Sequence, residues 1–207
     1  MNKRNKKNHL QIWKHHNLEN YLGKIILNFI SIKREDNMKH LEWKNFHSEI
    51  LFSLLSRSYT VSDLQVTENF YKQFYNFIGL TEDETNVFCS DLENIEYTTN
   101  EKQTFLFIQR VDKGVLFENN LDTKYSDETE LKKNYKRVIS DGTNIIKIVR
   151  FFHKKDDCKK CSYQLNNSVF ITAEQLSDFF IDWCYSQEYE SLAIGMYRQY
   201  AKKLLRM

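Results

Sequence analysis

The hydrophobic positions of the chain follow a helical period at both ends and a strand-like pattern in the middle. Spacings of three and four residues predict amphipathic helices over about 17–30 and 41–56, and a further helix that ends near Ile78 with Gly79 as its cap. The same spacing predicts two helices at the C-terminal end. The first carries Leu176, Phe179, Phe180 and Trp183 on one face, and the second carries Leu192, Met196, Tyr197, Tyr200 and Leu204.

Two capping boxes mark helix starts. In Thr81-Glu82-Asp83-Glu84, the Thr81 hydroxyl and the Glu84 carboxylate can each satisfy a backbone N–H that the first turn leaves without a partner. We expect this helix to run through Ile95. Thr172-Ala173-Glu174-Gln175 repeats the pattern and opens the first of the two C-terminal helices.

The middle of the chain is rich in aromatic and β-branched residues. Residues 104–111 and 115–117 flank a turn at Asp112-Lys113-Gly114, which predicts a β-hairpin. Residues 136–140 and 144–152 flank Asp141-Gly142, which predicts a second one. Residues 163–165 and 169–172 complete a predicted antiparallel meander. Because residues 145–152 are apolar on both faces, we expect them to form a central strand.

The predicted order of helices, then strands, then helices, without βαβ alternation, indicates the α+β class. We expect an antiparallel sheet of four to six strands flanked by N-terminal and C-terminal helices. Residues 1–37 are interpreted as an extension, a basic tail followed by an amphipathic helix, and residues 38–207 as a single α+β domain. Met38 is an alternative start of translation.

Composition indicates a globular intracellular protein. The chain is 41% hydrophobic and 28% charged, and it has no apolar run long enough to span a bilayer. Four cysteines in 207 residues, without a signal peptide, favour a reducing compartment, so we expect a cytoplasmic location.

Charge is unevenly distributed although the net charge is only +2. Residues 1–40 hold nine Lys and Arg against three Asp and Glu, a net +6, which leaves a net −4 for the remainder. Residues 81–100 hold six acids and no base. The basic and acidic segments either recruit partners of opposite charge or neutralise each other within the fold.

Soft metal ligands gather at one place. Cys158 and Cys161 are two residues apart, and His153 precedes them by five residues, so all three could reach one tetrahedral zinc ion. Cys184, on the next predicted helix, could supply the fourth ligand. Half of a zinc motif is often a coincidence. A redox dithiol and an exposed polar loop with no ligand are the alternatives, and the polar loop is the simplest interpretation.

Basic and aromatic residues gather on and beside the predicted second hairpin. Cations there could follow a phosphate backbone while a tyrosine stacks on a base. We therefore hypothesise a surface that binds nucleic acid or an acidic protein; the alternative is an ordinary solvated sheet face. Its residues are Lys136, Arg137, Lys147, Arg150, Lys154, Lys155, Lys159, Lys160 and Tyr163.

The chain contains no Gly-rich phosphate loop, nucleophile elbow, H-E-x-x-H sequence or dinucleotide fingerprint. This favours a non-catalytic binding or regulatory protein. One alternative is a metal-dependent nuclease that uses Asp112, Asp122 and Lys124, although Asp122 and Lys124 fall in a predicted loop. Another is a subunit of a larger assembly, held through the helix at residues 17–32.

Overall fold

A computed structural model describes residues 46–57, 66–90, 92, 94–99, 104–121, 128–140, 142–158, 167–188 and 191–205, all of which belong to one compact unit. The predicted N-terminal extension, including its amphipathic helix, lies outside these residues. No helix in the described ranges is long and apolar enough to cross a bilayer.

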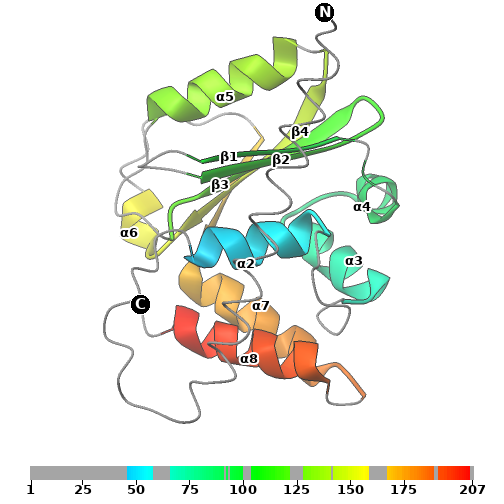
Figure 1. Ribbon diagram of the computed structural model, residues 1–207, viewed down its shortest axis with the longest axis vertical. Helices are drawn as coiled ribbons and strands as arrows, with labels where there is room; N and C mark the ends of the chain where they lie inside the picture. Colours follow the sequence, from blue (N-terminus) through cyan, green and yellow to red (C-terminus); the bar gives the residue numbers. More distant parts are fainter. Residues whose placement is uncertain are drawn as a thin grey trace, which may run out of the picture. The chain divides into compact units, whose positions relative to one another are not determined.

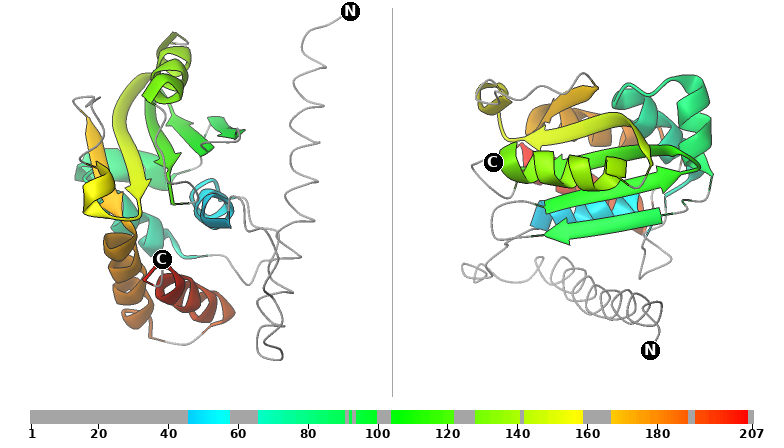
Figure 2. Two further views of the ribbon diagram at one scale, coloured as in Figure 1. Left: turned by 90° about the vertical axis from the view of Figure 1, so that its left-hand side faces the viewer. Right: turned by 90° about the horizontal axis from the view of Figure 1, so that it is seen from above.

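The described unit is a five-stranded sheet between two helical layers (Figure 1). Helix α5 covers one face of the sheet, and α2, α3, α7 and α8 lie on the other side (Figures 1 and 2). The strands are β1 (Asn94–Thr99), β2 (Thr104–Arg110), β3 (Lys113–Asn119), β4 (Asn144–Phe152) and β5 (Ser168–Thr172), and they lie side by side in chain order. The broad α+β class is therefore confirmed.

The sheet is mixed, and the prediction of a purely antiparallel sheet was wrong. Strands β1, β2 and β3 form an antiparallel meander, but β4 pairs parallel to β3 and β5 pairs parallel to β4. The hairpin around residues 111–114 is confirmed, with Arg110 opposite Lys113. The central position of β4, between β3 and β5, is also confirmed.

The second predicted hairpin does not exist, because residues 136–140 belong to helix α5 (Glu128–Ser140). Leu131, Tyr135 and Val138 recur at helical spacing, and their burial on the sheet outweighs the hairpin signal of Asp141-Gly142. Gly142 has φ +83° and follows the helix end, where its N–H donates to the Ile139 carbonyl. The helix forms the crossover that parallel pairing of β3 and β4 requires.

Local signals placed most other helices. They are α2 (Phe46–Leu55), α3 (Glu68–Phe77), α4 (Glu82–Cys89), α7 (Ala173–Tyr185) and α8 (Leu192–Leu204), with a short α6 (Lys155–Cys158) that was not predicted. Both capping boxes are formed. Gly79 follows α3 at φ +81°, as its predicted cap role requires. Helix α4 stops at Cys89 rather than near Ile95, because residues 94–99 pair with β2 instead.

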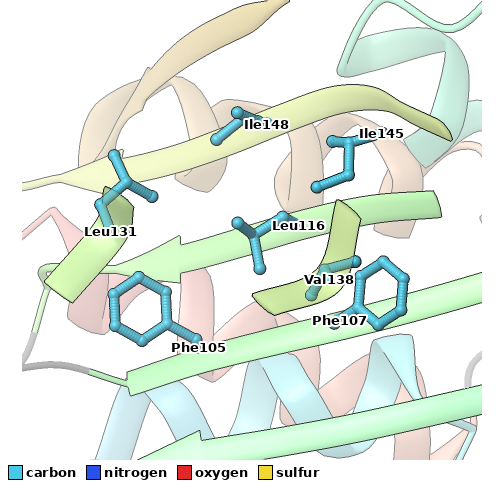
Figure 3. Packing of buried hydrophobic residues seen from close by; sticks show 7 residues of the cluster. All are labelled: Phe105, Phe107, Leu116, Leu131, Val138, Ile145 and Ile148. Atoms are coloured by element: carbon cyan, nitrogen blue, oxygen red, sulfur yellow. The ribbon is translucent and has the colours of Figure 1, made fainter. Parts of the chain in front are cut away.

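Two apolar layers hold the unit together. Under α5, Leu131 and Val138 pack on Phe105, Phe107, Leu116, Ile145 and Ile148 of the sheet (Figure 3). On the opposite side of the sheet, rings of α3, α7 and α8 contact one another, and the Phe74 ring reaches Phe117 of β3, with centroids 6.4 Å apart. Apolar side chains thus bury the central strands β2, β3 and β4, as the hydrophobic effect favours.

Gly114 provides a test of the packing under α5. A Cβ added there would clash with the buried Phe107 ring, whose Cζ would lie 2.8 Å away. We expect Gly114→Ala to lower the free energy of unfolding by about 1–3 kcal/mol through overpacking. Urea unfolding measures the loss. In the Phe107→Leu background the same substitution should cost clearly less, and equal losses in both backgrounds would contradict this packing.

Candidate nucleic-acid interface

Four cations occupy the outward face of α5. Lys132, Lys133, Lys136 and Arg137 are all exposed, and together they are called the α5 basic face. Positions 132 and 136, and 133 and 137, are four residues apart, so each pair spans about 6 Å along the helix axis. Leu131 and Val138 bury the opposite side of the helix, which fixes the direction in which these cations point.

Two cations of the α5 basic face form ion pairs at the protein surface. Arg137 forms an ion pair with Glu96 of β1, and Lys133 Nζ lies 3.5 Å from Glu130 Oε1. All four side chains are at least about a quarter exposed, and such surface pairs contribute at most about 1 kcal/mol. A phosphate can therefore replace either carboxylate at small cost.

Arg150, which the sequence placed on the binding surface, is buried inside the fold. Its side chain and that of Glu118 are both 0% exposed, and they form an ion pair across the paired strands β3 and β4. Glu128, the first residue of α5, lies 3.4 Å from the Arg150 guanidinium. The guanidinium also lies 5.5 Å and 5.4 Å from the ring centroids of Phe152 and Phe170. Arg150 thus has a structural environment, not that of a phosphate ligand.

Lys147 reaches the turn between α3 and α4. Its Nζ would lie 3.5 Å from a Cβ at Gly79, and it is one of the charges that act on Glu84. The Thr81 backbone N–H lowers the pKa of Glu84 most, with help from the Thr81 hydroxyl, Lys113 and Lys147, whereas burial opposes the shift. Lys147 is therefore separated from the α5 basic face.

Lys154 and Lys155 lie at the carboxyl end of β4, whereas Lys136 and Arg137 precede its amino end. A nine-residue strand spans about 30 Å, so these two pairs of cations do not form one cluster. Asp156 and Asp157 follow directly and balance the charge of Lys154 and Lys155. The remaining predicted residues, Lys159, Lys160 and Tyr163, lie outside the described residues.

The structure leaves the zinc hypothesis as a prediction. His153 directly follows β4, and Cys184 is buried in the last turn of α7, where its Sγ lies 3.5 Å from the Ile194 carbonyl oxygen. Thr172 pairs with Phe152, the residue before His153. Cys184 lies twelve residues after Thr172, which is about 18 Å along the helix. Cys161 and the Cys158 side chain lie outside the described residues, within which no group of three or more potential ligands is found.

The nuclease alternative gains nothing from the described geometry. Asp112 is exposed in the turn that precedes β3, and Leu121 follows the other end of that strand. Asp122 and Lys124 lie outside the described residues. The seven residues of β3, which span about 23 Å, thus separate Asp112 from Leu121, the residue before Asp122.

Sequence reasoning missed Lys132 and Lys133, which complete the α5 basic face. The available signal was the helical spacing of Leu131, Tyr135 and Val138, which places Lys132 and Lys133 on the solvent side. Comparison of the chain with protein-family models, curated proteins and solved structures finds no match.

Glu84 gives a pH-dependent prediction. Its pKa is lowered in the folded protein, so its contribution to stability is present above the unfolded value near 4.3–4.5 and is lost as pH falls through the lowered folded value. We expect the free energy of unfolding to decline less between pH 5 and pH 3 in Glu84→Gln than in the wild type. Chemical denaturation at each pH measures this, and parallel declines would contradict the assignment.

Proposed function

We propose that this protein is a non-catalytic binding protein that contacts nucleic acid through the α5 basic face. The observation that carries the proposal is the presence of four exposed cations on one face of a helix whose other face is buried on the sheet. Phosphate groups are the natural partners of such a surface, since neutralising them releases condensed counterions.

The scaffold supports this role because it presents the cations in a fixed arrangement. Leu131 is 0% and Val138 3% exposed, and both contact a core contributed by three strands. Glu128 additionally ties the start of α5 to the buried Arg150. A surface held in place before binding loses less conformational entropy when the ligand arrives.

The first test is a charge-neutral variant of the proposed surface. Lys132→Gln with Lys136→Gln keeps helix propensity while removing two cations four residues apart. We expect this variant to bind a labelled 20-mer nucleic acid at least about tenfold more weakly at 0.1 M salt, measured by fluorescence anisotropy, because each lost phosphate contact removes nearly one released counterion.

Lys72→Gln with Lys202→Gln is the matched control, since both lysines are exposed on α3 and α8, on the other side of the sheet. It should retain wild-type affinity within about twofold, the size expected for a non-specific change in net charge.

Lys154→Glu with Lys155→Glu tests the loop after β4, where we expect a smaller loss. Equal affinities for the α5 variant and the wild type would exclude the proposed surface. Capture of an acidic protein through the same lysines, without nucleic-acid binding, would instead assign the surface to a protein partner.

A further inference from the structure

Glu96 of β1 meets the α5 basic face from a different element. Strand β1 lies at one edge of the five-stranded sheet (Figure 1), and Glu96 lies opposite Phe107 in the register of β1 and β2. Cross-strand partners share a face of the sheet, and Phe107 packs beneath α5 together with Val138. Glu96 therefore lies on the side of the sheet that α5 covers, where its carboxylate pairs with Arg137.

Both oxygens of the Glu96 carboxylate have hydrogen-bond partners. Oε2 accepts from the Arg137 guanidinium, and Oε1 accepts from Asn94 Nδ2 at 3.3 Å. Asn94 is two residues earlier on the same face of β1, and its Nδ2 also lies 3.5 Å from Oε1 of Gln109 on β2. The sheet thus orients this carboxylate toward Arg137.

The ion pair is accessible to a ligand, since the side chains of Arg137 and Glu96 are 47% and 31% exposed. A phosphate that approaches Arg137 must displace the carboxylate or lie beside it, and two anions so close repel each other. In both cases Glu96 weakens the contact between Arg137 and the phosphate. By contrast, Lys133, the partner of Glu130 on the same helix, is 74% exposed, so its long side chain can turn toward a ligand.

Resting on the proposed function, we propose that Glu96 is a built-in competitor for nucleic acid at the α5 basic face. Its carboxylate binds Arg137 in the free protein and opposes a phosphate at the same guanidinium. An exposed ion pair of this kind shifts an equilibrium constant by at most about fivefold. The competition therefore lowers the affinity of the site without closing it, and loss of the Glu96 charge should strengthen binding.

Glu96→Gln tests the proposal, because glutamine keeps the size of the side chain and can still accept from Asn94 while it loses the charge. We expect this variant to bind the labelled 20-mer about three- to fivefold more tightly than the wild type at 0.1 M salt, measured by fluorescence anisotropy. Asp178→Asn is the matched control, since it removes one negative charge from the exposed surface of α7, on the other side of the sheet. Its affinity should stay within about twofold of the wild type.

Arg137→Gln, measured in two backgrounds, supplies the second readout. Its loss of affinity should be about three- to fivefold larger in the Glu96→Gln background than in the wild type, because the carboxylate no longer opposes the contact that is removed. A gain from Glu96→Gln that persists undiminished when Arg137 is also replaced would overturn the proposal, since Glu96 would then act through its general field and not through this cation.

Two further results separate this inference from the proposed function. If Lys132→Gln with Lys136→Gln weakens binding while Glu96→Gln binds like the wild type, the α5 basic face stands as the binding surface and the competitor is excluded. If both variants bind like the wild type, the inference and the proposed function both fall.

Discussion

The buried ion pair between Glu118 and Arg150 is the constraint on which the arrangement of this fold depends. Both side chains are fully buried, and they sit opposite each other on the parallel strands β3 and β4. A one-residue slip would turn one of these charges to the opposite face of the sheet, into the layer that holds Phe117 and Phe151. An unpaired buried charge costs several kcal/mol, so the pair specifies one register even if it adds little net stability.

That register positions α5 and its cations. Glu128 lies beside Arg150 at the start of the helix, and Val138, near its end, packs on the sheet together with Ile145, at the start of β4. The helix therefore runs antiparallel to β4, over the sheet face on which Arg150 lies. Because Leu131 and Val138 pack against the sheet, the α5 basic face points to solvent. The proposed binding surface is thus a consequence of how β3 and β4 pair.

Much of the fold was predictable because its signals are local. The capping boxes at Thr81 and Thr172, the glycine after α3 and the hairpin between β2 and β3 each depend on a few adjacent residues. Parallel pairing could not be predicted in that way, because Glu118 and Arg150 are 32 residues apart and only the folded sheet brings them together. For the same reason Arg150 was taken for a surface cation, although an arginine within a strand that is apolar on both faces was a signal of burial. Lys136 and Arg137 were identified, but within a hairpin rather than on the helix that exposes them.

The most direct test of this account is a double-mutant cycle on the buried pair, with Glu118→Leu, Arg150→Met and the combined variant measured by urea unfolding. Arg150→Met should lower the free energy of unfolding by about 3–5 kcal/mol because it removes the cation that Glu118 is buried against. Glu118→Leu should cost less than Arg150→Met, because Glu128 remains 3.4 Å from the Arg150 guanidinium. The combined variant should recover at least about 2 kcal/mol relative to the sum of the single losses. Single losses below about 1 kcal/mol that simply add would show that the pair does not determine how β3 and β4 associate.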